Sequence, residues 1–368
     1  MKTAMSGFER VSRTLNRQSV PQLAYNESLW GETVKRYTQE GHLQEGEDVG
    51  KHFGFCMRSC PWINGTANLD FEEQILEETE ETVLSKNGNY ASLRRKKSGS
   101  GTPEHVDFDV KERAAWEDLI KPHLTAFDDR RLNREGYHSG RQQAAEQEQF
   151  FIWSGVGPFE QIHPVCGHEY MCMGMALDPD WIKDMVLTYA NFTIMHLEEL
   201  FENDVLPDGF FFYEDMGFKQ RPFMSPAMYK ELIQPGHKLL FDYCHSKGRK
   251  VIVHSCGFVE PLVPGLIEAG MDCLQAMEVK AGMDMPRLAS QFGDQIAFYG
   301  NVDVRELISN DRSCIDAELD KKVLPVLAQG GSYILSSDHS IPPEVDYDTL
   351  CYFFEQSHRL AQAAGALA

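Results

Sequence analysis

The sequence predicts an α/β protein, with a (β/α)8 TIM barrel as the first choice of architecture and an open doubly wound sheet as the second. After Gln149, apolar runs of strand length alternate with segments of helical periodicity. Each run is almost continuously apolar, which is typical of a parallel sheet covered by helices on both faces. The expected strands are residues 150–153, 209–213, 251–253, 273–277, 296–299 and 333–335.

Helical patterns fill the intervals between these strands and follow the last one. Asp178-Pro179 and Ser225-Pro226 mark two helix starts, and Gly248 and Gly270 mark two helix ends. The expected helices are residues 180–201, 226–245, 259–269, 286–292, 315–328 and 346–363. An early strand at residues 20–25 (VPQLAY) brings the number of units close to the eight of a closed barrel.

The first third of the chain has a different texture. Residues 7–16 suggest a short helix, and residues 32–62 show a helical pattern interrupted by glycines. Polar β-like runs flank Asn87-Gly88, a dipeptide typical of hairpin turns. We therefore expect a single barrel domain over residues 1–368, with an N-terminal extension and a hairpin-like insertion, or flap, at about residues 75–110. Residues 112–119 and 140–148 are expected to be surface helices.

Composition narrows the class of protein. The chain has 368 residues, is 42% hydrophobic, and carries 35 basic against 56 acidic residues, a net charge of −21. Such an acidic surface disfavours nucleic acid and anionic membranes as partners. No apolar stretch reaches membrane-spanning length, the N-terminus lacks a hydrophobic signal core, and the 9 cysteines are scattered as reduced thiols would be. These features predict a soluble, cytoplasmic protein.

Polar side chains follow the predicted strands, at the end of a barrel where reacting groups gather. They are Asn26 after the early strand, then Glu214 and Asp215, His254 and Cys256, Glu278, Asn301 and Asp303, and Asp338 and His339. Capping of the next helix is the alternative explanation, above all for Asp303. Capping does not explain two histidines, or a cysteine beside one of them.

The stretch KVIVHSCG at residues 250–257 holds the strongest signal for chemistry. His254 and Cys256 are two residues apart, so on an extended backbone they project to the same side. Imidazole and thiolate together favour zinc, although a lone H-x-C is more often packing. With His339 as a third ligand, and Glu214 or an exogenous group as the fourth, the site has the open form of a catalytic zinc. Such a zinc can turn a substrate thiol into a thiolate, a good acceptor for an alkyl group.

The run at residues 254–303 (HSCGFVEPL to FYGNVD) carries a resemblance, together with FYEDMGFKQRPFMSP before it and YILSSDHSIPPEV after it. It resembles the uroporphyrinogen decarboxylase superfamily, from about residue 150 to the C-terminus. This superfamily contains porphyrinogen decarboxylases and zinc-dependent, cobalamin-linked methyltransferases that methylate coenzyme M. The resemblance implies a (β/α)8 barrel with its site at the C-terminal mouth.

The two branches imply different roles for the same residues. His254 and Cys256 match the zinc ligands of the methyltransferases, whose third ligand is a cysteine where this chain has His339. Decarboxylases have a histidine near that place, so His339 does not separate the branches. The arginine-rich N-terminal signature of decarboxylases has no counterpart here, since Arg13 and Arg17 lack its order.

Two enzymatic hypotheses follow, beside a non-enzymatic binding subunit. The favoured one is a zinc-dependent methyltransferase whose methyl group comes from a corrinoid carried by a partner protein. The alternative is a metal-free decarboxylase in which Tyr213, Asp215 and His339 hold a carboxylated substrate. Residues expected to contact substrate are Asn26, Glu278, Asn301, Asp303 and Asp338. The sequence leaves the substrate and a homodimeric state open.

Overall fold

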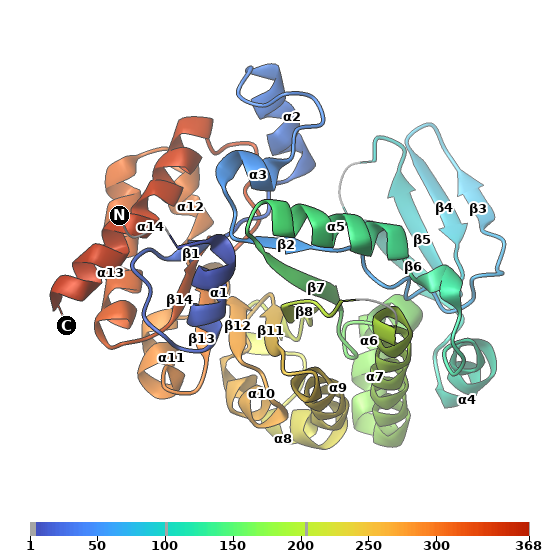
Figure 1. The fold of residues 1–368 in the computed structure, drawn as a ribbon. Helices are drawn as coiled ribbons and strands as arrows, with labels where there is room; N and C mark the ends of the chain where they lie inside the picture. The colour runs from blue at the N-terminus through green and yellow to red at the C-terminus, as the bar shows by residue number, and fades with distance from the viewer. Residues whose placement is uncertain (1–4, 100–101, 203–204, 368) are drawn as a thin grey trace.

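The computed structural model describes residues 5–99, 102–202 and 205–367. Its centre is a parallel sheet of eight strands in the order β1-β14-β13-β12-β11-β8-β7-β2. The bounds are β1 Ala24–Tyr25, β2 Met57–Ser59, β7 Phe150–Val156, β8 Gly209–Tyr213, β11 Lys250–Ser255, β12 Cys273–Ala276, β13 Ala297–Gly300 and β14 Tyr333–Leu335. The two ends of the sheet meet where Cys56 N donates to Tyr25 O at 3.0 Å, so the sheet curls into a barrel (Figure 1).

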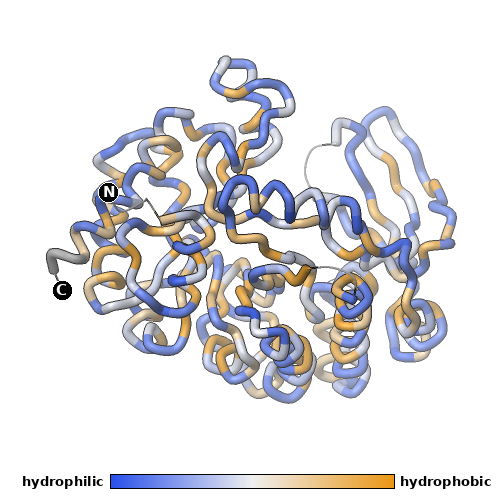
Figure 2. The backbone as a smooth tube through the Cα atoms, in the orientation of Figure 1, coloured by the Kyte–Doolittle hydropathy of each residue, from blue (hydrophilic) through white to orange (hydrophobic). Residues whose placement is uncertain are grey.

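One or more helices follow each barrel strand and cover the outside of the sheet (Figure 1). The major ones are α2 Gly31–Gln39, α3 Val49–Phe53, α5 Arg134–Glu146, α6 His163–Leu177, α7 Pro179–Glu202, α9 Gln234–Ser246, α10 Val263–Ala269, α11 Met285–Phe292, α12 Val304–Ile308, α13 Arg312–Ala328 and α14 Tyr347–Leu367. Short helices α4 Arg113–Ala115 and α8 Pro226–Met228 precede longer helical turns. Apolar segments concentrate where strands and helices face each other (Figure 2).

Side chains of alternate strand positions fill the barrel interior. Ile152, Phe211, Ile252 and Ile334 belong to one buried cluster, which also includes Val11 and Leu15 of the N-terminal helix. That helix, α1 Gly7–Leu15, begins with a capping box in which Ser6 accepts from Glu9 N, and it packs beside β1, β7 and β14. The N-terminal end of the barrel is thus packed with apolar side chains, which leaves the C-terminal end for a cavity.

The predicted insertion is an antiparallel sheet of four strands beside the barrel (Figure 1). Its strands are β3 Gln74–Glu78, β4 Thr82–Lys86, β5 Ala91–Lys96 and β6 Glu104–Phe108. It packs on α6, and its small core contains Ala91, Leu93 and Phe108. A separate two-stranded ribbon, β9 Gly217–Phe218 with β10 Arg221–Pro222, follows β8.

The barrel and the insertion predicted from sequence are confirmed, with one strand in an unexpected place. Residues 57–59, inside the stretch expected to be helical, form β2 and pair with β7. Three residues are too few for a period-2 pattern, so the sequence gives no signal for this strand. Helix α6 was also not expected, because its many methionines and glycines show no apolar stripe.

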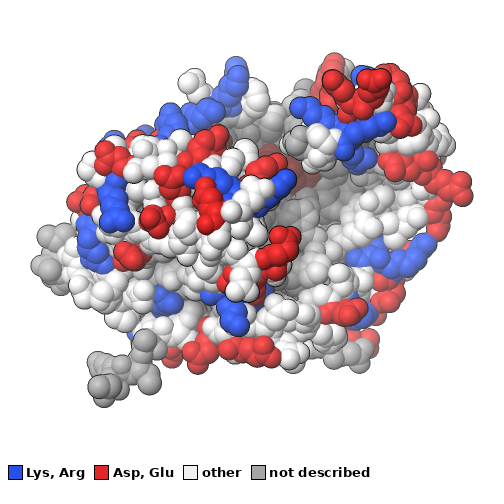
Figure 3. All heavy atoms as spheres, turned by 90° about the horizontal axis from the view of Figure 1, so that it is seen from above, with Lys and Arg blue, Asp and Glu red and all other residues white. Residues whose placement is uncertain are grey.

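Two surface properties bear on partners. Acidic and basic side chains are interspersed over the face seen in Figure 3, without a dominant basic patch. Among the described residues, no helix combines the length and the apolar character needed to cross a membrane.

Candidate active site

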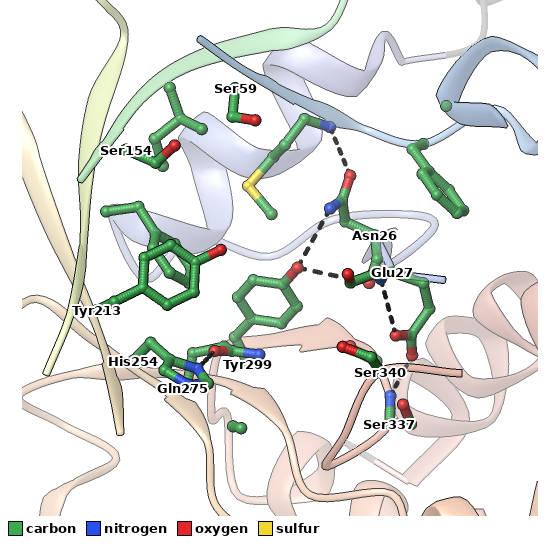
Figure 4. Close-up of a pocket in the computed structure, with 18 of the residues that line it drawn as sticks. Asn26, Glu27, Ser59, Ser154, Tyr213, His254, Gln275, Tyr299, Ser337 and Ser340 are labelled. Atoms are coloured by element: carbon green, nitrogen blue, oxygen red, sulfur yellow. Dashed lines mark hydrogen bonds between the residues drawn. The ribbon is translucent and has the colours of Figure 1, made fainter. Parts of the chain in front are cut away.

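A cavity of about 490 Å³ opens at the C-terminal ends of the barrel strands (Figure 4). Its wall is built from strand ends and the loops after them, from β1, β2, β7, β8, β11, β12, β13 and β14. Serine, asparagine and tyrosine side chains alternate with phenylalanine and isoleucine, so the wall is polar and apolar in similar measure. The volume is within the range of sites for small molecules.

Three potential metal ligands meet at one side of this cavity. A carboxylate oxygen of Asp215, a ring nitrogen of His254 and the sulfur of Cys256 all lie within 4.8 Å of one another. His254 Nε2 is 3.4 Å from Cys256 Sγ and 3.4 Å from Asp215 Oδ1. Ligands at 2.0–2.3 Å from a tetrahedral zinc are about 3.3–3.8 Å apart, so these separations match the ion's requirement.

Neighbouring groups hold the ligands in place. His254 Nδ1 contacts Gln275 Oε1, which favours a proton on Nδ1 and leaves the lone pair of Nε2 for a metal. Asp215 Oδ1 accepts from Cys256 N at 2.8 Å. Gly257 has φ +74°, and a Cβ there would lie 2.4 Å from the backbone of Gly217. The glycine after Cys256 is therefore required for the loops after β8 and β11 to approach each other.

The contact between His254 and Asp215 shifts the pKa of both groups. Burial lowers the pKa of His254, but hydrogen bonds with Asp215 and Cys256 outweigh this and raise it to about 10. Burial raises the pKa of Asp215, and its contacts with His254 and Cys256 N nevertheless bring it below the ordinary value. Both pKa shifts reflect the attraction between the imidazolium of His254 and the acceptors around it.

Glu214, the carboxylate favoured from sequence as a fourth ligand, lies elsewhere. Its side chain is fully buried, and its oxygens accept from Phe159 N at 3.1 Å, Glu160 N at 2.8 Å and His237 Nε2 at 2.7 Å. A Cβ on Gly157 would lie 2.2 Å from this carboxylate, so Gly157 provides the space that Glu214 occupies. Asp215 takes the place beside His254 that the sequence analysis gave to Glu214.

His339 lines the same cavity but lies outside the group of three. Its side chain is exposed, its Nδ1 is 3.3 Å from Ser340 O, and its ring packs edge-on against Trp30. Among the described residues, the only group of three or more ligands close enough to share an ion is Asp215, His254 and Cys256. The structure does not bring His339 to that point.

Four other predicted site residues connect the loops of the mouth. Glu278 accepts from Gly257 N at 2.9 Å, and Asp338 accepts from Val279 N and Val304 N at 2.8 and 2.9 Å. Asn301 is fully buried and bonds Met277 O and Met285 N, while Asp303 caps α12 and pairs with Arg305. Of these four, only Asp338 lines the cavity.

Two further predicted residues, Tyr213 and Asn26, also line the cavity. The Tyr213 ring lies 5.0 Å from the His254 ring, measured between centroids, and contacts Trp62 on its other side. Asn26 donates to Tyr299 Oη at 3.3 Å and accepts from Met57 N at 3.2 Å (Figure 4). Asn26 therefore links β1 to the short strand β2 at the point where the barrel closes.

Glu27 is a cavity residue that the sequence analysis did not select. Its carboxylate accepts from Ser28 N at 3.3 Å and from Ser337 N, and only 9% of its surface is exposed. Burial raises its pKa from 4.5 to about 7, against the opposing effect of these hydrogen bonds. The only sequence signal was its place directly after the early strand, beside Asn26.

The raised pKa of Glu27 predicts a specific dependence of stability on pH. Between the unfolded value of 4.5 and the folded value of about 7, the folded state holds a proton that the unfolded state has lost, so rising pH destabilises the fold. Glu27→Gln removes this effect. We expect the stability of the variant relative to the wild type to increase by about 3 kcal/mol from pH 4 to pH 8, measured by urea unfolding. A constant difference across that range would contradict the assigned environment.

Comparison with known proteins places this site in a family. A family model described as "Uroporphyrinogen decarboxylase (URO-D)" matches residues 142–360, more than half of the chain. The chain belongs to the uroporphyrinogen decarboxylase family. The matched part contains all six predicted metal and catalytic positions, which are Tyr213, Glu214, Asp215, His254, Cys256 and His339, and the family assignment made from the sequence is confirmed.

Solved structures support the architecture of this family member. A methyltransferase from Methanosarcina mazei superposes with a TM-score of 0.63 at 14% identity, covering 96% of this chain and 98% of that one. At that identity the likeness shows the shared fold. A Xaa-Pro dipeptidase superposes with a TM-score of 0.31 at 14% identity, covering 62% of this chain and 59% of that one. A β-glucosidase from Pyrococcus furiosus superposes with a TM-score of 0.39 at 12% identity, covering 98% of this chain and 96% of that one. A search of curated proteins gave no match.

Proposed function

We propose that this URO-D family member is a zinc-dependent methyltransferase that methylates a small thiol. The observation that carries the proposal is the convergence of Asp215, His254 and Cys256 at the cavity wall, with separations suited to one zinc ion. Nitrogen, sulfur and oxygen donors from three side chains leave a fourth tetrahedral position for a substrate.

The protein's own residues would act in defined ways. Asp215 Oδ, His254 Nε2 and Cys256 Sγ would hold the ion, while Gln275 fixes the tautomer of His254. A bound zinc would lower the pKa of the acceptor thiol. Tyr213 packs beside His254 and restricts the direction from which the acceptor reaches this point.

The methyl donor that we propose is a corrinoid carried by a partner protein. During transfer a bond forms between the acceptor sulfur and the methyl carbon as the bond from that carbon to the donor breaks. The electron pair of the broken bond stays on the donor, and the thiol proton passes to solvent. Trp30 and Trp62, 44% and 48% exposed, contact the cavity residues His339 and Tyr213 and offer apolar surface at the mouth for the approaching donor.

The alternative, decarboxylation, is favoured by the family's description and by the presence of Tyr213 and Asp215 beside His254. The charge of the cavity weighs against a substrate with many carboxylates. Among the described residues that line the cavity, Arg58 is the one arginine or lysine, and it is held by Asp48, Gln143 and Gln149. Glu27, Asp48 and Asp338 line the same space, so no uncompensated positive side chain faces a polyanion there.

An assay with free methylcobalamin and 2-mercaptoethanol tests the proposal. We expect zinc-loaded protein to demethylate methylcobalamin in proportion to thiol, to lose this activity on chelation, and to regain it when zinc is returned. The methylated thiol should form in equal amount. Release of carbon dioxide from a porphyrinogen at a rate that chelators do not alter, with no methyl transfer, would support the decarboxylase instead.

A further inference from the structure

Glu27 lies across the barrel from the metal ligands. In the closed order of eight strands, β1 and β11 are four places apart in either direction, so the loops after them are on opposite sides of the mouth. Glu27 follows β1, whereas His254 and Cys256 end β11. Figure 4 shows Glu27 and His254 on opposite sides of the cavity, with Tyr299 between them. A short molecule whose one end reaches the ligands can therefore reach Glu27 with the other.

The carboxylate of Glu27 has no cationic partner among the described residues. It accepts from the backbone N–H groups of Ser28 and Ser337 and has the hydroxyls of Ser336 and Ser337 beside it, and no lysine, arginine or histidine of the described part of the chain is within ion-pair distance. Of the other acidic residues that line the cavity, Asp48 pairs with Arg58. Asp338, like Glu27, accepts backbone N–H groups with both oxygens, but its two donors are at the starts of two helical turns, whose dipoles favour a negative charge. Glu27 lacks both an ion-pair partner and such helical starts, so its charge is left for a ligand.

The surroundings of Glu27 suit an ammonium group. A buried carboxylate with a raised pKa gains most from a positive partner, because the partner offsets the cost of burial. Tyr299, which lies between Glu27 and His254 in Figure 4, presents an aromatic ring to the cavity, and aromatic faces attract cations. The hydroxyls of Ser336 and Ser337 lie beside the carboxylate and can accept the remaining N–H bonds.

We infer that the acceptor is a short aminothiol, whose ammonium group binds Glu27 while its sulfur faces Asp215, His254 and Cys256. This inference rests on the proposed function and adds the charge of the substrate to it. An acceptor with an anionic tail is disfavoured, because its negative charge would face Glu27 and find Arg58 already paired with Asp48.

Three thiols with the same two-carbon chain test the inference: cysteamine, 2-mercaptoethanol and 2-mercaptoethanesulfonate. We expect zinc-loaded protein to bind cysteamine most tightly in calorimetric titrations at pH 8, and 2-mercaptoethanesulfonate least tightly. Glu27→Gln should weaken cysteamine about tenfold or more and leave 2-mercaptoethanol within about twofold, since only the charged contact is lost. Comparing ratios between variants cancels the differences in thiol acidity.

Two controls keep the result interpretable. Glu80→Gln removes one negative charge from the exposed turn between β3 and β4 and should change none of the three affinities. Zinc content and the melting curve of Glu27→Gln should match the wild type at the same pH, apart from the stabilisation predicted above. Equal loss of all three thiols in Glu27→Gln would indicate a structural role and overturn the inference.

A second series separates this inference from the proposed function. Butylamine, butanol and butyrate have no thiol, so their binding to metal-free protein reports on Glu27 alone. If the protein prefers butylamine and this preference depends on Glu27, but no thiol binds to zinc-loaded protein, the ammonium-binding role of Glu27 is supported and the proposed zinc-thiol chemistry is refuted. If thiols bind through zinc but the anionic tail is preferred, the proposed function stands and the inference is overturned.

Discussion

Cys256→Ser is expected to lower zinc affinity by about a hundredfold or more. The sulfur is one of the three donors of the proposed zinc site, and a neutral hydroxyl is a much weaker ligand for this ion than a thiolate. Loss of a residue that only supports a ligand already costs 10–100-fold, so loss of the ligand itself should cost at least as much. Competition against a chromophoric chelator gives the affinity, and elemental analysis of the purified protein gives the metal content.

Two further variants make this prediction specific. Cys314→Ser changes another partly exposed free cysteine, which lies outside the group of three, and should bind zinc as the wild type does. His339→Ala should also retain zinc, because His339 is not within reach of the shared point. Wild-type affinity in Cys256→Ser would remove the basis for a metal site. Loss of zinc in His339→Ala would restore the ligand set expected from the sequence alone.

The barrel was predictable because its second half repeats one pattern. Each barrel strand from β8 onward is a short, almost continuous apolar run, and polar residues follow within a few positions. β8 and β14 have the expected bounds, and the other strands differ by a few residues at one or both ends. β2 was not predictable, because a strand of three residues between two buried cysteines has no periodicity of its own. Its place is set by pairing with β7.

The choice between Glu214 and Asp215 illustrates what the sequence left open. Side chains on a strand alternate between faces, so one of these neighbours must face the cavity and the other the surrounding helices. Residues 211 and 213 line the cavity, and Asp215 continues that series, whereas Glu214 continues the outward one. In the run GFFFYED the aromatic residues on both faces are alike, so no polarity pattern indicates which parity points inward.

His254 and Cys256 were predictable as a pair because they are two residues apart, and local strand geometry alone places their side chains on the same side. His339 required knowledge of a loop after a distant strand, where spacing along the chain gives no information about distance in space. Glu27 required knowledge of its neighbours. Glu27 matters because its side chain is buried and has no cationic partner among the described residues, and the neighbouring sequence predicts neither property.

Glu214→Ala is expected to destabilise the protein by about 3–5 kcal/mol. Both Glu214 and His237 have fully buried side chains, and removing Glu214 leaves the buried ring nitrogen of His237 without its hydrogen-bond partner. Two backbone N–H groups, of Phe159 and Glu160, would also lose their acceptor. Urea unfolding followed by circular dichroism should show the transition at clearly lower denaturant concentration.

A matched control uses Glu231→Ala, an exposed glutamate on the helical turn before α9, which should change stability by no more than about 0.5 kcal/mol. Glu214→Gln should be intermediate, because one amide oxygen can still accept a backbone N–H while the amide nitrogen faces the other. Glu214→Gln should also keep zinc affinity close to that of the wild type. If it instead loses zinc as Cys256→Ser does, Glu214 is a ligand and the arrangement of the loop after β8 is wrong. If it retains zinc while Asp215→Asn loses it, the alternation of faces along β8 has determined which acidic residue serves chemistry and which holds the fold.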